Sequence, residues 1–251
     1  MVGPPITGGG TGGAVGPIVM ADAGTFIADV APTMCSQLNI GILGNPGSNA
    51  SSNFQAWLEA RGTTVQRIQT TPDVPLTADA LQPFDVVVLD LPPRDYTADE
   101  AAIFGAWVAA GGGVASMSGY HDDTSQDWRA NSLLSQIGVA YSGDRIWGPV
   151  TMFAVHPITT GLTSVTFTGG YPVADLGGAG TRTPIAFIPS NGNQVTVAYA
   201  VQMGAGRAFV WGDEWIEFDS EWSSQPQIPQ LWLQVFSWIA PANRCTLIGI
   251  G

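Results

Sequence analysis

The fold is decided by residues 85–90, which read Asp85-Val86-Val87-Val88-Leu89-Asp90 and place four consecutive apolar residues between two carboxylates. A strand that is apolar on both sides is typical of a parallel sheet covered by helices on each face. Downstream, Thr97 and Glu100 form a capping box that predicts the start of a helix. That helix ends at the glycines 111–113, which lead into an apolar strand at 114–118. The segment therefore predicts a strand–helix–strand unit in a parallel sheet.

The same alternation of strand and helix signals extends upstream. A buried strand is predicted at 38–44, next to a loop of turn residues, and a second strand is predicted at 64–68. Between them, Ser52 and Gln55 make a second capping-box pattern that predicts a helix. Four strand–helix units in this order predict a doubly wound parallel sheet with right-handed crossovers.

The rest of the chain completes the predicted architecture. Residues 147–200 are rich in Thr, Val and Gly and predict an insertion of antiparallel strands. A core strand returns at 206–211, and an amphipathic helix at 228–239 closes the domain. We expect a three-layer α/β fold with a mainly parallel, flavodoxin-like sheet over residues 35–251. Residues 1–34 are rich in Gly and Pro and are interpreted as a leader or linker.

The composition of the chain indicates which classes of partner to expect. The chain has 251 residues, 45% of them apolar, and a net charge of −12 without a single lysine. Such an acidic surface repels phosphate backbones, so nucleic acid is not an expected partner. There is no apolar run of 18 residues, so no membrane span is expected. Acidity does not deter neutral sugars, and the expected partner is a carbohydrate or another small polar ligand. The oligomeric state is not predicted.

The two cysteines and the leader bear on localisation. Cys35 and Cys245 lie at opposite ends of the predicted domain, and the favoured interpretation is a disulfide between them. The alternative is two unrelated buried thiols. Met1 precedes a Gly/Pro/Thr stretch without a basic region, so no signal sequence is visible. The leader is interpreted as a linker left after export, which predicts a secreted, periplasmic or cell-surface protein.

Three features together resemble one known family. They are the strand at 85–90, the glycines at 111–113, and the strand that leads to Gly119-Tyr120-His121. Their order resembles the class I glutamine amidotransferase-like superfamily. That resemblance implies a cysteine nucleophile on a tight turn after a strand, where a helix N-terminus lowers the thiol pKa. Ser118 occupies that place and neither cysteine is near it, so no glutamine hydrolysis is expected.

Two further segments resemble a branch of this superfamily. One is His156-Pro157-Ile158-Thr159, followed by Gly161-Leu162, and the other is Gly206-Arg207 before a strand. With a final helix that carries Trp238, they are similar to the trehalose-utilisation (ThuA-like) branch. The resemblance covers about residues 38–241. It implies a domain that binds or processes a carbohydrate, and the Gly-rich leader adds the expectation of export.

The expected site lies where parallel strands end. Ligands of open parallel sheets bind outside the carboxyl ends of the strands. The strands that end at Leu43, Leu89, Ser118 and Trp211 are expected to lie side by side, so that their loops share one rim. The candidate catalytic residues in these loops are His121, Glu214, Ser118 and Asp122. The candidate ligand-binding residues are Asn45, Ser48, Arg94, Tyr120 and Trp215.

Each of the main candidates has a role and an alternative. His121, next to Asp122, is interpreted as a general base or metal ligand, and alternatively as a histidine of a surface turn. Glu214 is interpreted as an acid or base with Trp215 as a platform for a sugar ring, and alternatively as part of a solvated acidic loop. Ser118 as a nucleophile would need a base within reach, and no G-x-S-x-G pattern supports it.

The sequence is compatible with more than one hypothesis about cofactors and catalysis. No recognised ligand spacing predicts a metal or other cofactor, although a divalent cation between His121 and the nearby carboxylates is compatible with the residues. Trp128, Trp147 and Trp222 mark either a carbohydrate-binding surface or core packing. The competing hypothesis is a non-catalytic, amidotransferase-like scaffold in an extracellular or cell-surface assembly. The absent cysteine nucleophile and the long Gly-rich leader favour it.

Overall fold

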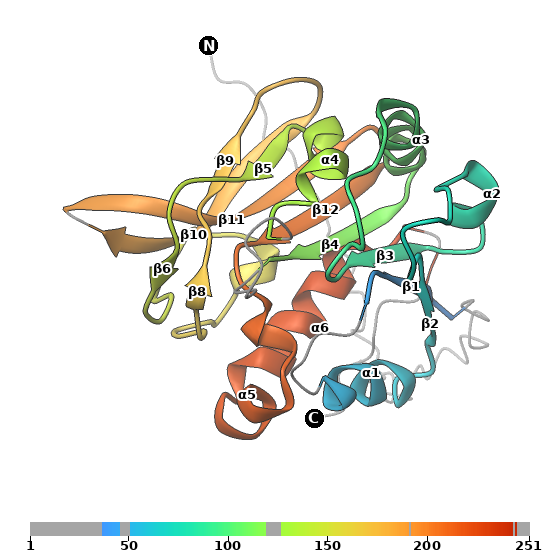
Figure 1. Cartoon of the computed structure of the whole chain (residues 1–251). Helices are drawn as coiled ribbons and strands as arrows, with labels where there is room; N and C mark the ends of the chain where they lie inside the picture. The colour runs from blue at the N-terminus through green and yellow to red at the C-terminus, as the bar shows by residue number, and fades with distance from the viewer. Residues whose placement is uncertain (1–36, 46–50, 119–126, 191, 243, 245–251) are drawn as a thin grey trace, which may run out of the picture. The chain divides into compact units, whose positions relative to one another are not determined.

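The computed structural model describes residues 37–45, 51–118, 127–190, 192–242 and 244 (Figure 1). The chain divides into two units, Met1–Met34 and Cys35–Gly251. All of the described residues, and therefore all of the helices and strands, belong to the second unit.

A mixed sheet of eight strands forms the centre of this unit, in the order β2-β1-β3-β4-β12-β11-β10-β7. The first five strands are mutually parallel, and the last three continue the sheet in antiparallel pairs. This confirms the predicted flavodoxin-like sheet with antiparallel strands. The strands are β1 (Asn39–Leu43), β2 (Thr64–Ile68), β3 (Val86–Leu89), β4 (Gly113–Met117), β7 (Met152–Phe153), β10 (Thr181–Ser190), β11 (Asn193–Met203) and β12 (Gly206–Trp211).

Helices cover both faces of the sheet, as Figure 1 shows. Helices α1 and α6 contribute to one buried apolar cluster, and α2, α3 and α4 contribute to the other. The helices are α1 (Ser52–Glu59), α2 (Ala78–Leu81), α3 (Ala98–Ala109), α4 (Asn131–Leu134), α5 (Asp219–Ser224) and α6 (Gln227–Ile239), with 3₁₀ turns η1 (Ser135–Ile137), η2 (Pro157–Thr159) and η3 (Glu214–Glu217).

The central strand β3 explains why both faces need a cover. Val86 and Val88 belong to the cluster under α1 and α6, whereas Val87 and Leu89 belong to the cluster under α3. Successive side chains of a strand point to opposite faces, so a run of four apolar residues requires apolar partners on both sides. The sequence prediction from residues 85–90 is thereby confirmed.

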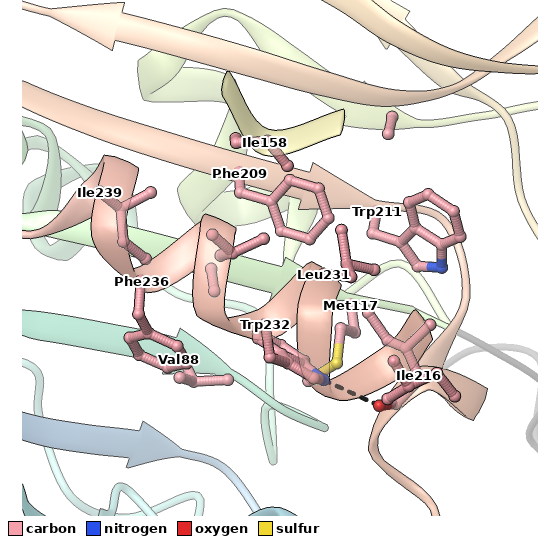
Figure 2. Close-up of a cluster of buried hydrophobic side chains, with 14 of the residues drawn as sticks. Val88, Met117, Ile158, Phe209, Trp211, Ile216, Leu231, Trp232, Phe236 and Ile239 are labelled. Carbon is pink, nitrogen blue, oxygen red and sulfur yellow. Dashed lines mark hydrogen bonds between the residues drawn. The ribbon is translucent and has the colours of Figure 1, made fainter. Parts of the chain in front are cut away.

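Helix α6 packs its apolar face along β4 and β12 (Figure 2). Leu231, Trp232 and Phe236 of α6 are buried in the same cluster as Phe209 and Trp211 of β12. The indole Nε1 of Trp232 donates a hydrogen bond of 2.8 Å to the carbonyl of Ile216, which lies in η3. This bond fixes the position of η3, the turn that comes after β12, against the core.

One of the two predicted capping boxes is present, and the other is replaced. At α3, Thr97 Oγ1 accepts from the N–H of Glu100, and the Glu100 carboxylate accepts from the N–H of Thr97. At α1, Ser51 is the N-cap residue and makes no side-chain capping bond. The carboxylate of Asp219 instead accepts from Ser52 Oγ at 2.6 Å and from the N–H of Asn53 at 2.7 Å. The prediction of a Ser52–Gln55 box was wrong because an acceptor distant in sequence satisfies this helix end.

The predicted antiparallel insertion is confirmed and is slightly longer than expected. Two small ladders precede the long β10–β11 hairpin, and the first of them begins at Val139. The ladders pair β5 (Val139–Tyr141) with β9 (Val173–Asp175), and β6 (Ile146–Trp147) with β8 (Thr168–Gly170).

Candidate functional site

The carboxyl ends of four parallel strands share one edge of the sheet. Strands β1, β3, β4 and β12 are consecutive neighbours and mutually parallel. This confirms the predicted adjacency of their ends. The loops after β1 and β3 pack closely, because a Cβ on Gly44 would lie 1.8 Å from the carbonyl oxygen of Asp90. Gly44 also has φ +122°, a conformation that favours glycine.

Five buried acidic residues gather at this edge, and we call them the acidic cluster: Asp90, Asp127, Asp213, Glu214 and Glu217. Each is 5% exposed or less. Asp90 comes directly after β3, and the last three come after β12 and lie in or next to η3. Their mutual influence shows in the pKa of Glu214, which is raised mainly by burial and further by the charges of Asp90, Asp213 and Asp127.

Two arginines balance part of this charge. Arg67 of β2 forms an ion pair of 2.7 Å with Asp90, and Arg145 forms one of 2.8 Å with Asp127. Arg145 Nε also donates to the hydroxyl of Tyr171 at 2.8 Å, and that hydroxyl donates to the Asp127 carboxylate. Asp90 and Asp127 are therefore compensated by cations. For the other three residues, burial is the main cause of a raised carboxyl pKa.

Glu214 is a carboxylic acid that holds its proton at neutral pH. Burial raises its pKa to about 8, and the charges of its acidic neighbours add to the effect. Its Oε2 atom is buried and has no hydrogen-bond partner among the described residues. A neutral carboxyl group with an unused oxygen can donate or accept a hydrogen bond to a ligand that reaches it.

Asp213 and Glu217 are held inside the fold. Burial raises the pKa of Asp213 to about 7, against the opposing effect of the N–H groups of Thr168 and Trp215, which donate to its carboxylate. Burial also raises the pKa of Glu217 well above its ordinary range, and so does its hydrogen bond to Asp90. Glu217 is therefore held in the interior beside Asp90, and its raised pKa favours the protonated form.

The candidate residues that the structure describes lie in different surroundings. Trp215 is half-buried beside Glu214, and its ring lies 5.7 Å from that of Phe218 at 62°. Asn45 is exposed just after β1. Ser118 is buried just after β4, where its hydroxyl donates a 2.5 Å hydrogen bond to the backbone carbonyl of Asp127. A carbonyl oxygen does not take up the hydroxyl proton, so this contact does not activate Ser118 as a nucleophile.

Arg94 is used within the fold. Its guanidinium forms a bidentate pair with Glu100, at 2.5 and 2.8 Å, and also donates to the carbonyl of Val74 at 3.0 Å. These bonds join the loop after β3 to the start of α3, and they account for the side chain without a ligand. The remaining candidates lie outside the described residues: Ser48, Tyr120, His121, Asp122, Cys35 and Cys245.

Sequence reasoning did not single out Asp90 or Asp127, and it took Glu217 only as part of the acidic stretch after the strand at 206–211. Asp90 carried a signal, because it ends the apolar strand that decides the fold and a carboxylate at a strand's carboxyl end faces the expected site. Glu217 lies three residues after Glu214, one turn of η3 further on. Asp127 gives no local signal, since its partners Arg145 and Tyr171 come from the insertion.

The three tryptophans considered for a carbohydrate surface divide into two kinds. Trp147 and Trp128 are exposed, at 61% and 43%. Trp222 is partly buried instead, with its ring 5.6 Å from that of Trp57 and 6.3 Å from that of Phe54. Trp222 therefore belongs to the packing between α1 and α5.

Neither a metal site nor a membrane helix is seen in the described part of the chain. There, no three His, Cys, Asp or Glu side chains come together in a way that could hold a metal ion. The cation considered with His121 stays a prediction, because His121 is not among these residues. None of the helices described is long and apolar enough to cross a bilayer.

Comparison with known proteins supports the fold. The sequence matches no protein-family model and no curated protein. In structure, the chain is similar to the N-terminal domain of mmIFT52, with a TM-score of 0.63 and 14% identity over 78% of this chain and 96% of that one. It is also similar to a ThuA-like protein from Bacteroides uniformis ATCC 8492, with a TM-score of 0.55 and 12% identity over 82% and 92%.

A third similar structure is Agd3, described as a novel carbohydrate deacetylase, with a TM-score of 0.53 and 14% identity. The match covers 79% of this chain but only 32% of Agd3. At such identities these similarities show the fold, which is the fold of ThuA-like proteins.

Proposed function

We propose that this chain binds a neutral carbohydrate, or a related small polar ligand, at the carboxyl ends of β1, β3, β4 and β12. In this proposal Glu214 donates a hydrogen bond or a proton to a ligand oxygen. The observation that carries it is the Glu214 carboxyl group, which is buried, has a pKa of about 8 and leaves Oε2 without a partner in the described chain.

The pKa of Glu214 supports a role in proton transfer. General acids and bases work best when their pKa lies near the working pH, and burial is a common way to raise a glutamate to that range. At pH 7 the group is protonated and can donate. The unpartnered Oε2 atom supports the same role independently, because it leaves one oxygen of the acid available to a ligand.

The charge of the acidic cluster favours an uncharged ligand. Asp90 and Asp127 are paired with Arg67 and Arg145, so their charges are compensated. An anionic ligand would need a cation to bind, and both of these arginines are already paired with carboxylates. Hydroxyl-rich ligands satisfy such a site through hydrogen bonds alone, and the ring of Trp215 offers an apolar surface for a sugar.

The remaining predicted residues complete the proposal. Asn45 and Ser48 after β1, and Tyr120, His121 and Asp122 after β4, would contribute polar contacts from the neighbouring loops. His121 would serve as the base that complements the acid Glu214, oriented by Asp122. The likeness to ThuA-like proteins and to Agd3 makes carbohydrate the first ligand class to test.

The experiment compares two isosteric variants across a panel of neutral mono- and oligosaccharides. Glu214→Gln keeps the shape of the side chain and removes the acid, whereas Glu59→Gln makes the same change on the exposed face of α1. We expect wild type and Glu59→Gln to bind the same sugar, and Glu214→Gln to bind it at least about tenfold more weakly, as loss of about 1.4 kcal/mol implies. Equal affinity in all three proteins would contradict the proposal.

A second candidate is a non-catalytic interaction domain, and two contacts favour it. The hydroxyl of Ser118 is bonded to a backbone carbonyl, and the guanidinium of Arg94 is bonded to Glu100. Both groups are therefore used for the fold rather than presented to a ligand. If the whole panel fails to bind, this interpretation takes precedence over the carbohydrate proposal.

Export is the last part of the proposal. The Gly-rich stretch at 1–34 resembles a linker, and a Cys35–Cys245 disulfide would fit an oxidising compartment. Thiol labelling of the native protein tests the disulfide directly.

A further inference from the structure

A surface hollow of about 340 Å³ lies beside β6 and β8, outside the acidic cluster. Its volume is within the range of about 300–1,000 Å³ that is typical of small-molecule sites. None of its lining residues carries a charge, although the whole chain has a net charge of −12. We call it the Trp147 hollow, and its lining consists of Trp147, Gly148, Pro149, Ser164, Thr166, Phe167, Thr168 and Gln225.

The wall of the hollow is an extended segment with two different faces. Val165 and Phe167 are buried in the core, at 0% and 2% exposure. The alternate residues Ser164, Thr166 and Thr168 are half-exposed and line the hollow. Since side chains alternate along an extended chain, three hydroxyl groups are presented in a row on one side.

Trp147 stands on the same side as these hydroxyl groups. It is the register partner of Thr168 in the antiparallel β6–β8 ladder, and side chains directly opposite each other share a face. The ladder continues beyond β6, because the N–H of Gly148 donates to the carbonyl of Phe167 at 2.9 Å. The indole is held over Gly169, where a Cβ would lie 3.2 Å from Nε1.

The chemical groups of the hollow are unused. Trp147 is 61% exposed, the largest exposure of any tryptophan in the described part of the chain. The hydroxyl groups of Ser164, Thr166 and Thr168 make no hydrogen bonds to other described residues, and neither does the side-chain amide of Gln225. An exposed aromatic face beside several free hydroxyl and amide groups matches a ligand with one apolar face and a hydroxylated rim.

We propose that the Trp147 hollow binds one sugar unit of a neutral glycan, with the pyranose ring against the indole of Trp147. The hydroxyl groups of the sugar would pair with Thr166, Thr168 and Gln225. A charged ligand is disfavoured, because the lining supplies neither a carboxylate nor an arginine. None of the residues assigned to proton transfer takes part, so the hollow can bind a sugar whether or not Glu214 acts on a ligand.

One hydrogen bond links the hollow to the acidic cluster. The N–H of Thr168 donates to the Asp213 carboxylate at 2.5 Å, and Glu214 is the next residue in the chain. The side chain of Thr168 lines the hollow, whereas its backbone N–H bonds to Asp213. Thr168 therefore contacts both the hollow and the acidic cluster. A glycan held at Trp147 would thus be retained beside the Glu214 site.

The test uses cellohexaose, mannohexaose, xylohexaose and maltohexaose, with anionic oligogalacturonate as the charged comparison. Saturation-transfer NMR and calorimetry measure binding to wild type, Trp147→Ala, Thr166→Val and the control Leu176→Ala. Leu176 is also an exposed apolar side chain, at 55%, and it is not part of the hollow. We expect at least one neutral hexasaccharide to bind, with affinity reduced at least about tenfold by Trp147→Ala and roughly threefold by Thr166→Val.

Three outcomes would overturn the proposal. They are binding of none of the four neutral sugars, preference for oligogalacturonate, or unchanged affinity in both hollow variants. Glu214→Gln separates this inference from the proposed function. If Glu214→Gln retains sugar binding while Trp147→Ala loses it, the hollow is a binding site and the assignment of Glu214 fails. The reverse pattern removes the hollow and keeps Glu214.

Discussion

Replacing Glu214 with glutamine should flatten the dependence of stability on pH above about pH 5. Burial raises the pKa of Glu214 from its ordinary value of 4.5 to about 8. Between these values the folded protein holds a proton that the unfolded chain has lost. The free energy of unfolding therefore falls as pH rises, by about 1.4 kcal/mol for each pH unit, and the decline ends near the folded pKa.

From pH 5.5 to pH 8 this single group removes about 3 kcal/mol of stability from the wild type. A glutamine at the same position has no proton to lose, so Glu214→Gln should avoid that part of the decline. For a domain of this size the difference amounts to roughly 6–12 °C in Tm at the alkaline end. Asp213, whose pKa burial raises to about 7, contributes in the same direction in both proteins and leaves a residual slope.

The assay is urea unfolding monitored by tryptophan fluorescence at several pH values, for wild type, Glu214→Gln and the exposed control Glu59→Gln. The quantity of interest is the change in unfolding free energy between pH 5.5 and pH 8 in each protein. Glu59→Gln should behave like the wild type. Parallel curves for wild type and Glu214→Gln would refute the reasoning, because they would mean that Glu214 titrates alike in the folded and unfolded states.

Three further changes test other parts of the structure. Gly44→Ala should destabilise the fold by about 2–3 kcal/mol in urea unfolding, because a Cβ there meets a backbone carbonyl at 1.8 Å; a loss under about 0.5 kcal/mol would show that the loops are not in contact. Arg94→Met should lower the free energy of unfolding by about 2–3 kcal/mol at pH 7 and by less near pH 3. The reason is that Arg94 lowers the pKa of Glu100, and the stabilisation from this ion pair is lost as Glu100 is protonated. Equal losses at both pH values would contradict the ion pair. Thiol alkylation of the native protein should modify neither Cys35 nor Cys245, and dithiothreitol should lower Tm markedly; two modified thiols would exclude the disulfide.

The layered fold could be predicted from the sequence because its signals are local. Four apolar residues at 86–89 require a cover on both faces, and the Thr97–Glu100 capping box marks the start of α3 within the sequence itself. The side-by-side strand ends are a consequence of the same pattern, since each apolar run leads into a polar loop. At α1 the same approach failed, because the capping acceptor is Asp219, which is 167 residues from Ser52.

The acidic cluster could be predicted only in part, because burial is a property of the assembled fold. Glu214 was identified from its place after a core strand, but the sequence allowed a solvated loop equally well. What decides between them is that Trp232 of α6 holds η3 against the core through Ile216. Asp127 joins the cluster through Arg145 and Tyr171, which lie 18 and 44 residues further along the chain. No local sequence pattern predicts such a contact.

The most direct test of the acid role of Glu214 is an NMR titration of its carboxyl carbon, assigned by the absence of that signal in Glu214→Gln. The titration is recorded for the free protein and for the protein saturated with the neutral sugar that binds in the panel. We predict a midpoint near pH 8 in the free protein. Because the protonated group donates to the ligand, the sugar should raise this midpoint further. A midpoint near 4.5, or one that the bound sugar leaves unchanged, would contradict the claim that Glu214 is the acid of the site.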